Sequence, residues 1–209
     1  KTRIRSDGVA DVDASRSEAR ILARFEHPNI VAVRRFFEAN GTAYLVMDYC
    51  DGEPLDEIIK RDGQLSKERL DRILLPLLNG LEEIHSTNFL HRDIKPANIM
   101  YEPESDQVKV TDFGIARITD ASRTRTGLVL GTPSFMSPEQ LAGHHVDGRS
   151  DLYSLGAMLF QLLTGELPLK ADSLSALMYQ IAHTVPPDVH SLRPELPPAL
   201  GVLIARAMS

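Results

Sequence analysis

The chain has 209 residues, of which 25% are charged, and a formal net charge of −6 at pH 7. This acidic balance argues against generic binding to nucleic acids or anionic membranes, because both partners favour a basic surface. The hydrophobic fraction of 43% is ordinary for a globular protein and is enough for one large core or two modest cores.

A single cysteine, Cys50, excludes an intrachain disulfide and favours a reducing, cytoplasmic setting. The densest apolar run, residues 155–163, contains Gln161 and falls short of the ~18 residues that a membrane span needs. Residues 1–20 are polar and mixed in charge, which is not typical of a signal peptide. The chain begins with Lys and ends abruptly, so we expect a fragment of a longer protein, which can itself be membrane-anchored.

The first elements in chain order are a helix and a hairpin. Apolar residues near helical spacing predict a helix over residues 14–26, which Pro28 ends. Two runs rich in β-forming residues follow, at residues 30–39 and 42–49. The Asn-Gly pair between them, residues 40–41, predicts a tight turn that pairs the two strands.

Helices dominate from there on. We predict a turn at residues 51–54, a short helix at 55–61, and a long amphipathic helix at 66–85 with Ser66 as its N-cap. The next segment, residues 91–100, reads HRDIKPANIM and is expected to be a loop.

The last third combines a strand, a long loop and three helices. Residues 108–110 predict a short strand, and residues 115–150 have little periodicity, which indicates a long functional loop. Helices are predicted at residues 151–164, 173–183 and 197–208, the first of them ended by a glycine. The order of elements indicates an α+β fold.

The loop HRDIKPANIM and the residues after the predicted strand carry the side chains for chemistry. Asp93 can accept or orient the proton of a hydroxyl group. Lys95 can neutralise a transferring phosphoryl group. Asn98 offers an amide oxygen and Asp112 a carboxylate, which are hard ligands that suit Mg²⁺.

Three motifs in this order give the chain a specific resemblance. Residues 91–93 with Asn98 fit the pattern H-R-D-x-x-x-x-N, residues 112–114 fit D-F-G, and residues 137–139 read S-P-E in place of A-P-E. The chain resembles the eukaryotic-like protein kinase family. Lys95 is typical of its Ser/Thr-specific members, and segments such as HPNIV and SDLYSLG resemble bacterial Ser/Thr kinases.

The resemblance implies a two-lobe kinase fold with a partial β-sheet in the small lobe. Residues 1–47 would form the incomplete small lobe, with one helix and the last two strands of its sheet. Residues 48–50 would be the hinge, and residues 51–209 the mainly α-helical large lobe, which stops before the family's final helix.

The resemblance also implies roles at the reaction centre. Asp93 would be the catalytic base, Lys95 would stabilise the charge of the transition state, and Asn98 and Asp112 would bind Mg²⁺, with Mn²⁺ as an alternative. Thr132 would contact Asp93 and Lys95. The sequence leaves open whether Asp93 abstracts the proton or mainly orients the hydroxyl.

ATP would lie between the lobes. Glu18 would pair with a strand lysine, for which Lys1 stands at the family's usual spacing. Met47 would be the gatekeeper and Met100 the floor of the adenine site. A solvated carboxylate for Glu18 and ordinary buried methionines are the alternatives. The ATP-binding set is therefore Lys1, Glu18, Met47, Asp48, Cys50 and Met100.

Further residues would have structural roles: His91, Arg92, Phe113, Gly114, Glu139 and Asp151. Asp151 is compatible with a first-turn acid on a helix and with binding the backbone of the HRD segment, and both can hold together. The family's arginine partner of Glu139 lies beyond the chain's end, so we expect Glu139 to lack a partner.

The predicted loop contains Thr124 and Thr126, where bacterial members of the family are phosphorylated. A phosphate there would pair with Arg92 and could order the loop. We predict activation by autophosphorylation, in a kinase dimer if it occurs in trans; incidental threonines are the alternative.

No glycine-rich phosphate loop occurs in the chain, so we expect the chain alone to bind ATP poorly. The leading function is an ATP-dependent protein Ser/Thr kinase that acts on protein substrates. A non-catalytic, kinase-like scaffold is the alternative. A small-molecule phosphotransferase fits less well, because residues 115–139 resemble a platform for protein substrates.

Overall fold

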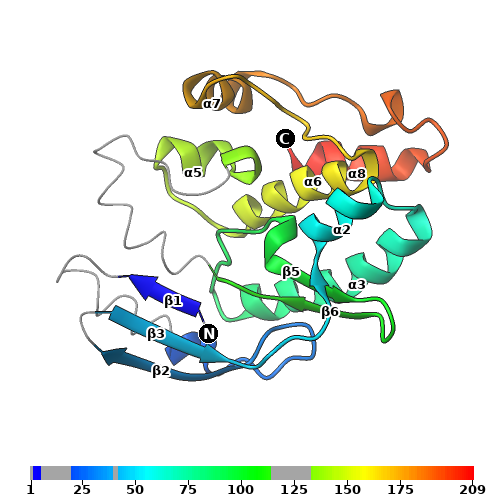
Figure 1. Cartoon of the computed structure of the whole chain (residues 1–209). Coiled ribbons are helices and arrows are strands. Elements are labelled where there is room, and N and C mark those ends of the chain that lie inside the picture. The colour runs from blue at the N-terminus through cyan, green and yellow to red at the C-terminus, as the bar shows by residue number, and fades with distance from the viewer. Residues whose placement is uncertain (1, 6–19, 40–41, 114–132) are drawn as a thin grey trace.

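The structure is a computed structural model that describes residues 2–5, 20–39, 42–113 and 133–209. A small β-sheet extends from one side of a larger, mainly helical body (Figure 1). Several predicted functional residues lie outside the described residues: Lys1, Glu18, Gly114, Thr124, Thr126 and Thr132.

The small sheet has three antiparallel strands in the order β1-β3-β2: β1 (Thr2–Arg5), β2 (Val33–Ala39) and β3 (Thr42–Met47). Ala39 pairs with Thr42, which confirms the predicted hairpin. The strand β1 was not predicted, because four residues without clear alternation carry too weak a pattern. Its pairing with β3 adds a strand directly after Lys1, where the sequence predicted none.

The predicted helix before the hairpin ends earlier than expected. Residues 20–22 are helical, and a turn follows in which Phe25 donates its backbone N–H to the carbonyl of Leu22 at 3.2 Å. Leu22 and Phe25 are both buried, at 1% and 4% exposure. The turn therefore keeps both side chains on the core, as the i and i+3 positions of a helix also would.

A second antiparallel sheet lies in the larger body, in the order β4-β5-β6. Its strands are β4 (Glu53–Pro54), β5 (Ile99–Glu102) and β6 (Gln107–Val110). The strand β6 was predicted, whereas β4 and β5 were assigned to a turn and a loop. An isolated parallel bridge between Ile30 and Val110 connects this sheet with the chain that enters β2.

Helices α2 (Leu55–Asp62) and α3 (Lys67–Ser86) match their predictions closely. The Ser66 side chain accepts a hydrogen bond from the backbone N–H of Arg69 at 3.3 Å, so Ser66 is the N-cap, as predicted. The apolar stripe of α3 is buried and supports the loop that follows.

Helix α6 (Gly148–Thr164) lies in the middle of the helical body (Figure 1) and is buried along most of its length. It begins earlier than predicted, because Asp147 is the N-cap and accepts from the Arg149 N–H at 2.9 Å. Gly165, at φ 75°, ends the helix as predicted. Asp151 thus lies in the first turn of α6.

The predictions for α7 (Leu174–His183) and α8 (Pro198–Ala207) are confirmed within one or two residues. Helix α5 (Pro138–Ala142) lies inside the segment that was predicted to be a loop. Short 3₁₀ turns complete the described part: η1 (Pro96–Asn98), η3 (Pro133–Phe135) and η4 (Val189–Ser191). Over the described ranges, no helix combines the length and apolarity of a membrane span.

Candidate active site

The side chain of Asp151, which is 1% exposed, binds the backbone of the HRD segment. The carboxylate accepts from the backbone N–H of His91 at 2.9 Å and from that of Arg92 at 2.8 Å. Nε2 of His85 lies 2.8 Å from the same carboxylate. Burial opposes ionisation of Asp151, but these donors hold its pKa below the ordinary value. Both sequence interpretations of Asp151 therefore apply.

The imidazole of His91 joins the loop to the strand that leads to Asp112. Its Nε2 lies 3.0 Å from the carbonyl oxygen of Thr111, and its Nδ1 accepts from the backbone N–H of Asp93 at 3.3 Å. This pattern requires the neutral tautomer with the proton on Nε2. Complete burial lowers the pKa of His91 and thereby favours the same neutral form.

Three of the predicted catalytic residues share hydrogen bonds. The Lys95 ammonium donates to Oδ2 of Asp93 at 2.8 Å, and Nδ2 of Asn98 donates to the same oxygen at 3.0 Å. Asn98 also donates to the backbone carbonyl of Asp93 at 2.7 Å and to that of Asp112 at 3.4 Å. The loop therefore fixes Asp93 and orients Asn98 by its own contacts.

Asn98 and Asp112 have the donor chemistry of a Mg²⁺ site. Because Nδ2 of Asn98 makes the donated bonds, its amide oxygen Oδ1 points elsewhere and is suited to a cation. Asp112 is exposed and adopts φ 50°. Mg²⁺ takes few protein oxygens, so this pair fits it. In the described part of the chain, no cluster of three or more His, Cys, Asp or Glu residues could hold a metal.

Phe113, the residue that follows Asp112, packs in a cluster of aromatic rings. It stacks on Phe25 with centroids 6.2 Å apart, meets Phe89 edge-on at 6.1 Å, and contacts the His91 ring at 4.8 Å. The cluster joins the catalytic loop to the chain before β2. The sequence indicated Phe25 only as an apolar position of the predicted helix, and Phe89 gave no signal beyond its aromatic character.

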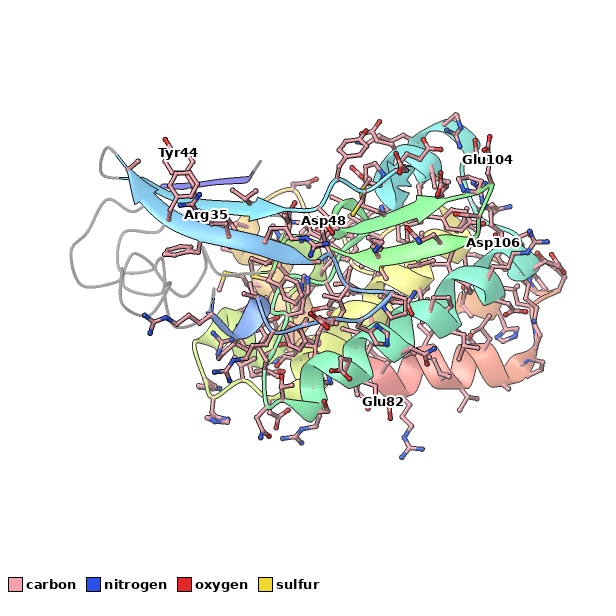
Figure 2. All side chains as sticks on the ribbon, turned by 90° about the horizontal axis from the view of Figure 1, so that it is seen from below. Arg35, Tyr44, Asp48, Glu82, Glu104 and Asp106 are labelled. Atoms are coloured by element: carbon pink, nitrogen blue, oxygen red, sulfur yellow. The ribbon has the colours of Figure 1, made fainter. Side chains whose placement is uncertain are left out.

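The predicted hinge begins at Asp48, where the small sheet meets the larger body (Figure 2). Its backbone N–H donates to the carbonyl of Ala32 at 2.9 Å. Its carboxylate accepts from Nε of Arg34 at 2.6 Å, and this ion pair lowers the pKa of Asp48. Arg34 was not identified from the sequence.

The other predicted adenine-site residues lie on both sides of that junction. Met47 ends β3 and Cys50 follows two residues after Asp48; both are partly buried against the core. Burial raises the pKa of the Cys50 thiol, so the thiol stays protonated near neutrality. Met100 lies in β5 and pairs with Lys109 of β6.

The segment that carries S-P-E is attached to α6. Glu139 accepts a hydrogen bond from the Ser150 hydroxyl, so the expectation that Glu139 lacks a partner was wrong. Burial opposes ionisation of Glu139, but the Ser150 bond lowers its pKa. The Ser154 hydroxyl donates to the backbone carbonyl of Phe135 at 2.6 Å. One turn of α6 therefore holds both this segment and, through Asp151, the catalytic loop.

The fold combines a small antiparallel sheet with a helical body, and its HRD loop is anchored on a central helix. These are the features of a protein kinase domain. The family model described as the protein kinase domain matches residues 2–196, and the chain belongs to this family. It is 42% identical over 203 residues to the serine/threonine-protein kinase pkn3 of Myxococcus xanthus. It is 40% identical over 200 residues to PknA of Mycobacterium tuberculosis and 43% identical over 204 residues to PksC of Streptomyces coelicolor.

These alignments cover 92% of this chain but only 37%, 45% and 36% of the three relatives, so the chain spans less than half of their length. Among solved structures, a crystal structure of Rad53 residues 1–466 in complex with AMP-PNP matches with a TM-score of 0.81. That match covers 95% of this chain and 50% of the other at 24% identity, and it confirms the kinase fold.

Proposed function

We propose that this chain is the catalytic portion of an ATP-dependent protein kinase that phosphorylates serine and threonine hydroxyls. The observation that carries the proposal is the hydrogen-bonded set of Asp93, Lys95 and Asn98 beside the backbone of Asp112. Relatives from several bacteria are named serine/threonine-protein kinases, which supports the choice of hydroxyl.

In this proposal, the Asp93 carboxylate accepts a hydrogen bond from the substrate hydroxyl. This bond directs the hydroxyl oxygen toward the γ-phosphorus of ATP. The new O–P bond forms as the bond to the ADP oxygen breaks, and the hydroxyl proton leaves toward Asp93. Lys95 and Asn98 hold one carboxylate oxygen of Asp93, which limits its rotation. Lys95 would also stabilise charge on the transferring group.

Asn98 and Asp112 would hold Mg²⁺, with Mn²⁺ as an alternative. A bound divalent ion neutralises the charge of the ATP phosphates and keeps them in one orientation. The protein's own part is to aim Oδ1 of Asn98 by fixing its Nδ2, and to present Asp112 as an exposed residue next to it in the site.

We further propose that ATP binds between the small lobe, residues 1–47, and the large lobe, residues 51–209. The backbone of residues 48–50 would bind the adenine, with Met47 as the gatekeeper and Met100 as the floor of the site. Lys1 and Glu18 would pair near the phosphates. The AMP-PNP in the Rad53 complex is an ATP analogue and supports this class of ligand.

Regulation would involve the segment between the DFG and SPE motifs. Thr124 and Thr126 would be autophosphorylated, in trans within a kinase dimer, with Arg92 as the partner of the phosphate. Thr132 would contact Asp93 and Lys95 when a protein substrate is bound.

A phosphotransfer assay on a Ser/Thr peptide with Mg²⁺ and ATP tests this function. We expect Asp93→Asn and Asp112→Ala each to lower the rate by roughly 10²- to 10⁴-fold. Glu82→Gln changes an exposed carboxylate on α3, away from the small sheet (Figure 2), and should leave the rate unchanged. Equal rates for the unmodified chain and Asp93→Asn, or phosphate on tyrosine alone, would contradict the proposal.

A further inference from the structure

One side chain links helix α5 directly to the catalytic loop. Nε2 of Gln140 donates to the backbone carbonyl oxygen of Arg92 at 3.1 Å. Its Oε1 accepts from the backbone N–H of Ser137 at 3.0 Å, and its own N–H donates to the Ser137 hydroxyl at 3.3 Å. Both polar atoms of the Gln140 side-chain amide are thus bonded: the oxygen to the cap of α5, and the nitrogen to the catalytic loop.

The carbonyl that Gln140 binds is part of the peptide group between Arg92 and Asp93. The opposite side of Arg92 is held by α6, because the Arg92 N–H donates to Asp151 at 2.8 Å. Arg92 adopts φ 64°, a conformation that non-glycine residues rarely take without support. The two bonds together hold the peptide groups on both sides of Arg92, and the second of these groups carries Asp93.

A role in helix capping alone does not account for an amide at this position. The capping box at Ser137 uses only the acceptor oxygen of Gln140, and a glutamate serves equally well as that acceptor. Only an amide also supplies an N–H for the Arg92 carbonyl. The choice of Gln over Glu therefore depends on the loop, not on the cap.

We propose that Gln140 is a positioning residue for phosphotransfer: it couples the placement of α5 to the orientation of Asp93. This inference rests on the proposed role of Asp93. Since Ser150 and Ser154 tie the same segment to α6, a shift of the segment would reach the Asp93 peptide through the Gln140 side chain.

Residue-resolved hydrogen exchange of the full chain tests the coupling without requiring activity. Gln140→Glu keeps the acceptor for Ser137 but removes the donor for Arg92. We expect the amides of His91, Arg92 and Asp93 to exchange about three- to tenfold faster in this variant, as expected for the loss of one hydrogen bond of ordinary strength.

Two matched variants separate the loop from the cap. Ser137→Ala removes the hydroxyl that caps α5 and leaves the bond to Arg92 in place, so exchange should rise in α5 and not in residues 91–93. Gln64→Glu makes the same chemical change at an exposed position and should alter neither. Unchanged exchange of residues 91–93 in Gln140→Glu, or an equal rise in Ser137→Ala, would overturn the inference.

Kinetics supply the second readout. Gln140→Glu should lower kcat three- to tenfold while the KM for ATP stays constant, because the amide acts through Asp93 and not on the nucleotide. An unmodified chain without phosphotransfer would count against the proposed function alone, since the exchange experiment still decides the coupling. A normal kcat together with faster loop exchange would show that the contact does not position Asp93.

Discussion

At the scale of single residues, the site is organised by buried polar groups whose protonation states are fixed by their neighbours. His91 is fully buried, and it both donates to Thr111 and accepts from Asp93 through one neutral ring. A protonated ring would place an N–H against the N–H of Asp93. Burial accordingly lowers the pKa of His91 below its ordinary value of 6.5.

This lowered pKa predicts a pH dependence of stability. Below pH 6.5 the unfolded chain binds a proton at residue 91 that the folded chain does not, so the free energy of unfolding falls as the pH falls. One proton changes this free energy by up to about 1.4 kcal/mol per pH unit. We expect His91→Gln, which keeps an N–H donor, to show a correspondingly shallower slope in urea unfolding between pH 7 and 5.

His190 supplies a control of opposite sign. It contacts Asp188 at 3.2 Å and the carbonyl of Leu196 at 2.9 Å, and these acceptors raise its pKa. Its contribution to stability is present below pH 6.5 and is lost as the pH rises, so His190→Gln should make the acid-side loss steeper. Identical slopes in His91→Gln and the unmodified chain would show that residue 91 is not the titrating group.

At the scale of secondary-structure elements, the sequence predicts the existence of the helices best. The bounds of α2, α3, α7 and α8 are correct within one or two residues. Helix α6 begins earlier than predicted, because its cap at Asp147 was not identified from the sequence. The strand β5 was missed because its four residues follow the HRD loop without a turn signal and alternate only in the fold. The helix α5 has five residues, so its Ser137 cap was a signal without a stripe behind it.

Packing of β4 on β5 gives a test at this scale. Gly52, directly before β4, adopts φ 91°, and a Cβ atom there would lie 2.5 Å from the carbonyl oxygen of Tyr101. We expect Gly52→Ala to destabilise the fold by roughly 3 kcal/mol, because backbone strain and a clash with rigid backbone add. Chemical denaturation measures the change.

The matched control is Gly143→Ala. Gly143 also has a positive φ, of 68°, in the left-handed helical region, but no atom lies within 4 Å of the added Cβ. Only backbone strain remains, which costs about 1 kcal/mol. Equal losses in the two variants would mean that the contact with β5 does not constrain the strand.

At the scale of the whole molecule, the sequence predicts that the HRD loop and the DFG motif form the reaction centre, but it does not predict the contacts that hold them together. Motif spacing within a short stretch of the chain is what points to Asp93, Lys95, Asn98 and Asp112. The contacts of His85 with Asp151 and of Gln140 with Arg92 join residues far apart in the chain, and only the folded arrangement brings them together. The same holds for the pairing of β1 with β3.

The proposed nucleotide site takes residues from both parts of the molecule, so nucleotide binding should stabilise the fold as a whole. A ligand at 100 times its Kd adds about 2.7 kcal/mol to the free energy of unfolding. For a chain of this size, that corresponds to a rise in Tm of roughly 5–10 °C. Because the chain lacks a glycine-rich loop and should bind ATP weakly, this shift requires a nucleotide concentration far above the Kd. Under that condition we expect AMP-PNP with Mg²⁺ to produce it in a thermal melt, and AMP-PNP with EDTA a smaller one.

In the proposed site, the Mg²⁺-dependent part of the Tm shift requires the Asp112 carboxylate. Asp112→Ala should therefore melt at the same temperature with Mg²⁺ as with EDTA, while it keeps the shift that AMP-PNP causes without metal. Glu104→Ala removes an exposed carboxylate on the turn between β5 and β6 (Figure 2) and should retain the full Mg²⁺ effect. If the Mg²⁺ effect persisted in Asp112→Ala, the ion would bind elsewhere. If no nucleotide shifted the Tm at all, the two parts of the chain would not form the site between them.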